Sequence, residues 1–145
     1  MKQNDKDTRT KSDQAKKVEE FYYECQNWKS KLWFMQDETI FLDGLLNSYV
    51  FEPDTPNLFV RLQDYLERLQ KADRKKRKIM QRIIEHEKKL VGIFDCKDYA
   101  CDLSFYQKHD VLKAEVVSCV EDFQNLKGEI FNYAGGILKK RKPKE

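Results

Sequence analysis

The stretch "VEEFYYECQNWKSKLWFMQDETIFLDGLLNSY", residues 18–49, decides the fold of this chain of 145 residues. Its apolar residues recur at alternating steps of three and four, which keeps one seam of an α-helix facing a partner helix. The repeat lasts for more than four heptads and is interrupted only by Thr39. Its members are Val18, Phe21, Cys25, Trp28, Leu32, Met35, Thr39, Leu42, Leu46 and Tyr49.

Two further repeats of the same kind follow. The second consists of Leu58, Leu62, Tyr65, Leu69, Ala72, Lys76, Ile79, Ile83, His86, Leu90 and Ile93. The third consists of Phe105, His109, Leu112, Val116, Cys119, Phe123, Leu126, Ile130, Tyr133 and Ile137. Only five glycines and three prolines punctuate the chain, fewer than the turns of a sheet protein would need. The sequence therefore predicts an all-α, antiparallel up-down-up bundle of three long helices with coiled-coil-like heptad packing.

The connections and the tails set the expected limits of this bundle. Thr55 can cap a helix whose first residue is Pro56, and Gly92 can end a helix before Asp95 or Asp98 caps the next one. We expect helices at about 13–51, 56–93 and 98–138, which together form one helical domain, 13–138. Residues 1–12 and 139–145 are basic and lack an apolar period, so both are expected to be disordered tails.

The first predicted helix has more apolar surface than one seam requires, and it carries half of the chain's aromatic residues. Trp33, Phe34 and Phe41 lie beside the seam rather than on it. Such a wide apolar arc suits a central helix that two neighbours cover. It also suits a surface that meets another subunit, because exposed aromatic patches usually mark interfaces. We take these three residues as the candidate protein interface, and a homodimer is the expected form.

Charge is distributed unevenly, since the stretches 1–17 and 139–145 together carry +7 of a net charge of +3. Within the remainder, residues 71–78, "KADRKKRK", hold six basic residues and one acidic residue. Lysine and arginine bind phosphates without sequence preference, so this run is a candidate nucleic-acid site. Its candidate residues are Arg74, Lys75, Lys76, Arg77 and Lys78. Antiparallel pairing of the second and third helices would instead place the run opposite Glu121 and Asp122, and we do not favour nucleic-acid binding.

The only two histidines of the chain, His86 and His109, both fall on apolar seams. A hairpin that matches Ile83 with Leu112 places the two imidazoles in one layer. With a third ligand such as Glu24 or Cys25 they could bind a metal ion. Alternatively, the rings hydrogen-bond to each other or to Glu24 or Tyr22, and so form a polar layer that fixes the register of the helices.

Several kinds of chemistry lack their motifs in this chain. The zinc-protease motif H-E-x-x-H would need a histidine at Leu90, and a ferritin-like centre would need glutamates at Ile83 and Tyr106. No phosphate-binding loop and no nucleophile motif is present in the sequence. We therefore expect a protein that is not an enzyme and that needs no cofactor.

The four cysteines do not follow a standard motif, because the only close pair, Cys96 and Cys101, has the spacing C-x4-C. The first 20 residues do not resemble a signal peptide, and no apolar run approaches the length of a membrane span. A cytoplasmic location with reduced thiols and without membrane contact is the expectation. The predicted function is a scaffold, adaptor or self-associating component, with nucleic-acid association as the first alternative and a metal-binding bundle as the second.

Overall fold

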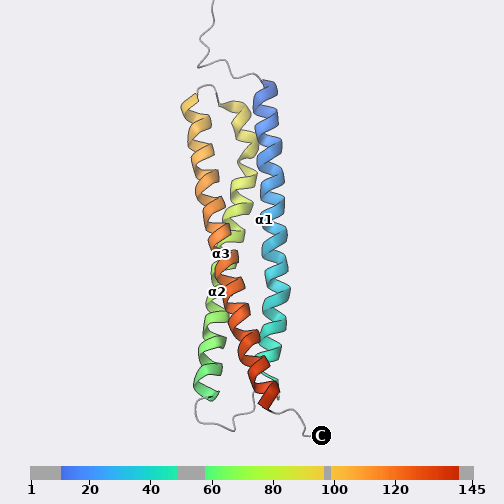
Figure 1. Cartoon of the computed structure of the whole chain (residues 1–145). Helices are drawn as coiled ribbons and strands as arrows, with labels where there is room; N and C mark the ends of the chain where they lie inside the picture. Colours follow the sequence, from blue (N-terminus) through green and yellow to red (C-terminus); the bar gives the residue numbers. More distant parts are fainter. Residues whose placement is uncertain (1–10, 49–57, 97–98, 141–145) are drawn as a thin grey trace, which may run out of the picture. The chain divides into compact units, whose positions relative to one another are not determined.

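The computed structural model describes residues 11–48, 58–96 and 99–140 of the chain. It contains the three long helices α1 (Lys11–Leu46), α2 (Leu58–Lys88) and α3 (Tyr99–Lys140), and the short 3-10 helix η2 (Leu90–Asp95) (Figure 1). Within the described ranges there is no strand. This confirms the predicted all-α bundle of three long helices.

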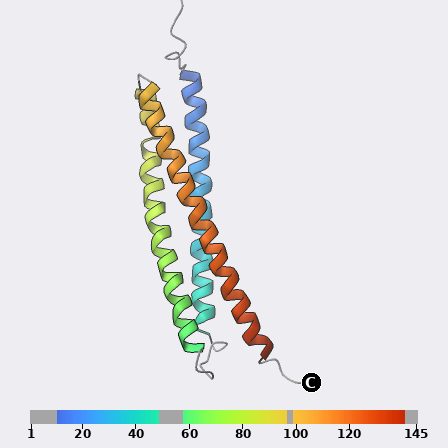
Figure 2. The same ribbon diagram turned by 60° about the vertical axis from the view of Figure 1, so that its left-hand side comes forward.

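The chain divides into two compact units, and each unit takes a segment from every long helix. Unit 1 comprises Met1–Lys31 and Lys78–Val117, and unit 2 comprises Leu32–Arg77 and Ser118–Glu145. Within each unit the three helices lie side by side (Figures 1 and 2).

Contacts between the helices give their directions in each unit. In unit 1, Gln14 and Gln26 of α1 bond to Ile93 and Glu87, respectively. His109 and Glu115 of α3 bond to His86 and Arg82, respectively, so α2 runs antiparallel to both neighbours. In unit 2, the pairs of Arg68 with Glu129 and of Lys75 with Asp122 show that α2 runs antiparallel to α3, and Figure 1 shows α1 running opposite to α2. The up-down-up order of the prediction thus holds within each unit.

The cores of both units are built from the predicted seams, with Cys96 and Ala134 as buried residues outside them. Unit 1 buries Phe21, Cys25, Trp28, Ile79, Ile83, Leu90, Ile93, Cys96, Leu112 and Val116. Unit 2 buries Leu32, Met35, Leu42, Leu46, Tyr65, Leu69, Cys119, Phe123, Leu126, Ile130 and Ala134. Burial of apolar surface at this three-four spacing is the main reason why these long, highly charged segments fold as helices.

The first helix starts earlier and ends earlier than the sequence suggested. Lys11 and Ser12, expected in the tail, belong to the first turn of α1, and Asp13 in that turn favours the helix N-terminus. At the other end, the backbone N–H of Asn47 bonds to Asp43 and that of Ser48 bonds to Leu45. The expected end at residue 51 and the Thr55–Pro56 start of the second helix lie outside the described residues.

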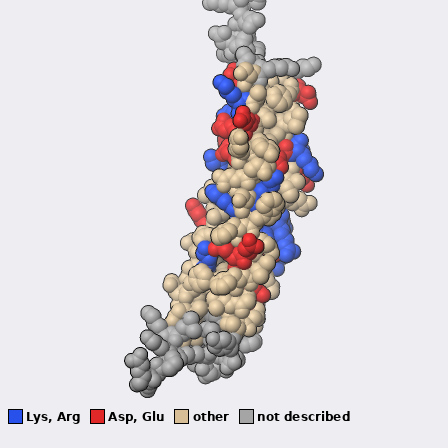
Figure 3. Space-filling model, turned by 90° about the vertical axis from the view of Figure 1, so that its right-hand side faces the viewer, with Lys and Arg blue, Asp and Glu red and all other residues tan. Residues whose placement is uncertain are grey.

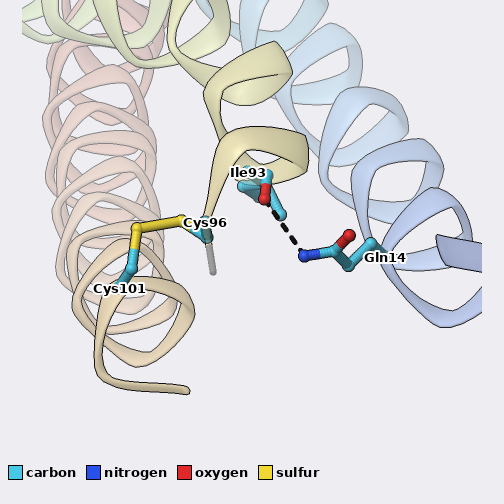
Figure 4. Close-up of a disulfide and its surroundings, with 4 residues drawn as sticks. All are labelled: Gln14, Ile93, Cys96 and Cys101. Atoms are coloured by element: carbon cyan, nitrogen blue, oxygen red, sulfur yellow. Dashed lines mark hydrogen bonds between the residues drawn. A yellow bond between two sulfur atoms is a disulfide. The ribbon is translucent and has the colours of Figure 1, made fainter. Parts of the chain in front are cut away.

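The end of the second helix also differs from the expectation of a continuous helix to about residue 93. α2 stops at Lys88, and tighter i to i−3 bonds follow, from the N–H of Lys89 to His86 and from the N–H of Gly92 to Lys89. Gly92 therefore lies inside η2 instead of ending the helix. The buried side chain of Gln14 donates a hydrogen bond from Nε2 to the carbonyl oxygen of Ile93 at 3.1 Å, which ties η2 to α1 (Figure 4).

The expectation of reduced thiols is wrong for one pair of cysteines. Cys96, directly after η2, and Cys101, in the first turn of α3, form a disulfide (Figure 4). The reversal of the chain between α2 and α3 brings their Cα atoms within 5.5 Å, a separation that suits a disulfide. Cys25 and Cys119 are free and buried, and burial raises the pKa of both thiols, that of Cys25 to about 12.

In the ranges that the structure describes, no helix is both long enough and apolar enough to cross a lipid bilayer.

Candidate functional site

A buried polar layer lies in unit 1 where the three helices meet. Nε2 of His86 on α2 is 2.9 Å from Nδ1 of His109 on α3, and Nε2 of His109 is 3.2 Å from Oε1 of Glu24 on α1. The two histidines therefore share one layer, as the hairpin pairing predicted. Of the alternatives weighed from the sequence, this geometry matches hydrogen bonding between the rings and to Glu24.

The chemistry of the three side chains fixes the direction of these hydrogen bonds. An ionised Glu24 can only accept, so Nε2–H of His109 donates to its carboxylate. In a neutral His109 the Nδ1 atom then has a free lone pair, and Nε2–H of His86 donates to it. Both imidazoles consequently carry their proton on Nε2. The two hydrogen bonds form a chain in which His86 donates to His109 and His109 donates to Glu24 of α1.

Aromatic rings enclose this layer. Phe21 stacks on His109 with ring centroids 3.9 Å apart, and Phe105 stacks on His86 at 4.3 Å. Trp28 adds a tilted contact with His109 at 4.7 Å. These rings exclude water from the two imidazoles, which favours their neutral forms.

The pKa values of both histidines respond to this enclosure. Burial, followed by the charge of His109, lowers the pKa of His86 to about 4. Burial also lowers the pKa of His109, although its hydrogen bond to Glu24 acts in the opposite direction. Glu24 is shared with Lys113, whose Nζ atom lies 3.4 Å from Oε2. The layer is thus a neutral imidazole pair at neutral pH, anchored to one carboxylate.

A second candidate site is the outer face of α1 in unit 2. Trp33, Phe34 and Ile40 are each 62% exposed and Phe41 is 60% exposed. Trp33 and Ile40 are seven residues apart, as are Phe34 and Phe41, so both pairs lie on one side of the helix. We call these four residues the aromatic face. Figure 3 shows the molecule from the side on which α1 lies in Figure 1. Broad parts of this surface carry no charged side chain.

The seam of α1 contacts both neighbouring helices, but these helices do not cover the wide apolar arc that a central helix would bury, and the aromatic face remains exposed. Within the described residues, Phe41 is the one member of this face that approaches another aromatic ring, that of Phe131 on α3, with centroids 6.2 Å apart. The three interface residues predicted from the sequence are therefore brought together on one exposed surface. Ile40 was missed, although its position seven residues after Trp33 was a usable signal.

Asp37 occupies the centre of the aromatic face and was also missed. It lies four residues after Trp33 and three after Phe34, and three before Ile40 and four before Phe41. These are the positions that neighbour it on a helix surface, and all four are apolar. None of the ion pairs formed between the described residues includes Asp37.

The structure divides the predicted basic run into different environments. Lys75 pairs with Asp122 at 3.6 Å, close to the pairing weighed from the sequence. Arg77 is held by Asp73 at 2.9 Å, while Arg74 and Lys78 are exposed. The run is therefore not one continuous ridge of free cations.

Lys76 differs from its neighbours because it points into the core of unit 2, where it is only 5% exposed. Its ammonium group donates to Asp73 at 2.9 Å and also to Gln36 of α1. This explains why a lysine occupies a seam position in the second repeat. It also means that Lys76 is turned away from any ligand outside the protein.

Among the described residues, no group of three or more His, Cys, Asp or Glu side chains is arranged to hold a metal ion.

Comparison of the chain with protein-family models, with curated proteins and with solved structures finds no match.

Proposed function

We propose that this protein acts without catalysis, through protein–protein contacts, as a scaffold, adaptor or self-associating component. The aromatic face is the contact surface in this proposal. The observation that carries it is the exposure of about three fifths of Trp33, Phe34, Ile40 and Phe41 on adjacent turns of α1.

The size of this face supports the proposal. Large aromatic side chains bury about 150–250 Å² each, so the three aromatic residues of the face, together with Ile40, leave on the order of 400 Å² of apolar surface in contact with water. A patch of that size is about as large as the largest found on ordinary monomers, and such patches often bind partners. Covering it would contribute favourable free energy in proportion to the apolar area removed from water.

A second copy of the chain is the first occupant to test, because a homodimer is the form that the sequence suggested. Sedimentation equilibrium at micromolar to high micromolar concentration tests it. Self-association through the aromatic face should weaken at least about tenfold in Trp33→Ala, since truncated aromatic anchors at interfaces often cost about 2 kcal/mol or more. Val111→Ala, a change at an exposed apolar residue of unit 1, is the matched control.

The broader proposal has its own test, because a partner other than a second copy is also possible. Wild type and the double variant Trp33→Ala/Phe41→Ser are used to capture proteins from the native cell, with nuclease added. Proteins retained by wild type and absent from the capture with the variant support a contact surface. Identical captures, together with a monomer in both cases, would rule out the aromatic face as the site of function.

A further inference from the structure

The centre of the aromatic face is acidic, and the surrounding part of α1 offers nothing to neutralise it. The segment Leu32–Leu46 contains Asp37, Glu38 and Asp43 and has no lysine or arginine. Of these acids, Glu38 is partly buried and already pairs with Lys127 of α3. Asp37 is exposed, and the four helix-surface positions next to it are apolar, so α1 cannot supply a counter-charge.

The same arrangement disfavours a second copy of the chain as the occupant. Two identical faces that pack symmetrically have the two-fold axis at the centre of the shared surface, where residues meet their own copies. Asp37, at the centre of the aromatic face, would therefore lie close to the Asp37 of the partner copy. Two carboxylates brought together in a water-poor interface repel each other. The basic run does not solve this, because none of its residues 71–78 is an exposed large apolar side chain that could cover Trp33 or Phe34.

A recess beside the aromatic face adds a further feature. Between α1 and α2, also within unit 2, lies a pocket of about 380 Å³. Ile40 forms part of both the pocket wall and the aromatic face, and Leu69 of α2 is the other apolar residue of the lining. The remaining lining residues are polar or charged: Gln36, Thr39, Asp43, Gln70, Asp73, Arg74 and Arg77. A helix that lies along the outer side of α1 could place one large side chain there, while its other apolar residues cover Trp33 and Phe41.

We propose that the aromatic face binds an amphipathic α-helix of another protein, one that carries a lysine or arginine in the middle of its apolar stripe. The apolar residues of that helix cover Trp33, Phe34, Ile40 and Phe41, and its basic residue pairs with Asp37. This rests on the proposed function, which it deepens by giving the chemistry of the partner. Helix-in-groove recognition through residues at i, i+3, i+4 and i+7 is a common mode of peptide binding.

Trp33 supplies a built-in reporter for the test. The chain has two tryptophans, and Trp28 is only 5% exposed whereas Trp33 is 62% exposed. Acrylamide in solution therefore quenches mainly Trp33 in the full-length protein. A helix that covers the aromatic face should protect Trp33 from quenching, and titration then gives a dissociation constant.

The probes are two designed helical peptides of about 18 residues that differ at one position, a length of roughly five helical turns. Both carry leucines at the same i, i+3, i+4 and i+7 positions and otherwise alanine and glutamine, and both lack tryptophan. One has lysine in the centre of the leucine stripe and the other has glutamate. We expect the lysine peptide to bind at least about tenfold more tightly than the glutamate peptide, since charge pairs in a partly desolvated interface discriminate by this order.

Variants assign that preference to Asp37. Asp37→Asn should reduce the ratio of the two dissociation constants to near one, while Glu121→Gln, which changes the net charge equally on an exposed part of α3, should leave the ratio unchanged. Equal binding of the two peptides, or a lysine preference that persists in Asp37→Asn, would overturn the proposal.

Two further results separate this proposal from the proposed function. A protein that already sediments as a dimer through Trp33, with Trp33 shielded before any peptide is added, overturns the basic helix as occupant and leaves the contact function intact. A monomer in which neither peptide protects Trp33, and whose captured proteins are the same for wild type and Trp33→Ala/Phe41→Ser, overturns both.

Discussion

His86 and His109 are hydrogen-bonded through Nε2 of the first and Nδ1 of the second, at 2.9 Å, so α2 and α3 are joined by two buried side chains of the same kind. Sliding one helix past the other by one turn would place an apolar seam residue such as Phe105 or Leu112 opposite His86. The ring nitrogen of His86 would then be buried without a partner, which costs about 1–3 kcal/mol. The pair therefore fixes the register of α2 against α3 within unit 1.

The first prediction is that the protein loses stability as the pH falls from about 6.5 toward about 4. In the folded state the pKa of His86 lies at about 4, below the ordinary value of 6.5, because burial disfavours its charged form. The unfolded chain thus binds more protons in this window, and acid favours unfolding. Each pKa unit corresponds to about 1.4 kcal/mol, so His86 alone should lower the free energy of unfolding by about 2 kcal/mol between pH 7.5 and pH 5.

Urea denaturation at the two pH values measures this difference. The matched variant is His86→Gln, which keeps a hydrogen-bonding side chain but cannot titrate. Its stability should depend on pH less steeply than that of wild type, with His109 providing the remaining slope in the same direction. Identical stability of wild type at pH 5 and pH 7.5 would contradict the neutral buried pair.

The second prediction concerns the protons of the layer. Since Glu24 can only accept, both imidazoles should be neutral at pH 7.5 and protonated on Nε2. Nitrogen NMR of the histidine side chains distinguishes the two tautomers directly, and Glu24→Gln should perturb His109 more than His86. A zinc-dependent change of these signals together with a rise in melting temperature, absent in His109→Gln, would instead favour the metal-binding alternative.

The third prediction compares two neighbouring lysines. Lys76→Ala should lower the free energy of unfolding by about 2 kcal/mol, because it opens a cavity and leaves the partly buried Gln36 without its donor. Lys75→Ala should change it by less than about 0.5 kcal/mol, because the pair with Asp122 is exposed to solvent. Urea denaturation of both variants at pH 7.5 provides the comparison. Equal effects would mean that Lys76 is not part of the core.

The fourth prediction is that labelled DNA and RNA do not bind at physiological salt. Ion pairs with Asp73 and Asp122 already engage part of the run 71–78. A clear shift in a gel or anisotropy assay would favour the nucleic-acid alternative. In that case the triple variant Arg74→Ser/Lys75→Ser/Lys78→Ser should reduce the salt dependence of log K by about 0.9 for each phosphate that the protein no longer neutralises.

The seams could be predicted from the sequence because helix positions that are buried at a regular spacing carry apolar residues at the same spacing. Every described member of the three repeats whose side chain the structure describes is buried or partly buried, including the polar members Lys76, His86 and His109. The shared layer of His86 and His109 followed from the same periodicity, since pairing one layer of a hairpin fixes the others.

Other features depend on details that a helical period does not contain. Residues 89–93 continue the apolar repeat, but the tighter turns of η2 place Leu90 and Ile93 in the core equally well. Periodicity could not tell whether Lys76 faces water, because that depends on Gln36 of another helix. The disulfide was missed because C-x4-C spacing shows no bonding until the chain reversal that joins α2 to α3 is known.

The Cys96–Cys101 disulfide makes the connection between α2 and α3 a covalent ring, and Lys97 lies inside it in the sequence. A tryptic cut after Lys97 would therefore break the backbone without separating the two halves of the molecule. The nicked protein should keep the mass of the intact chain plus one water under non-reducing conditions and should yield two fragments once the bond is reduced. In the oxidised molecule, a cut in the backbone at this reversal thus leaves the two parts of the chain covalently joined. Once the disulfide is reduced, the same cut separates them.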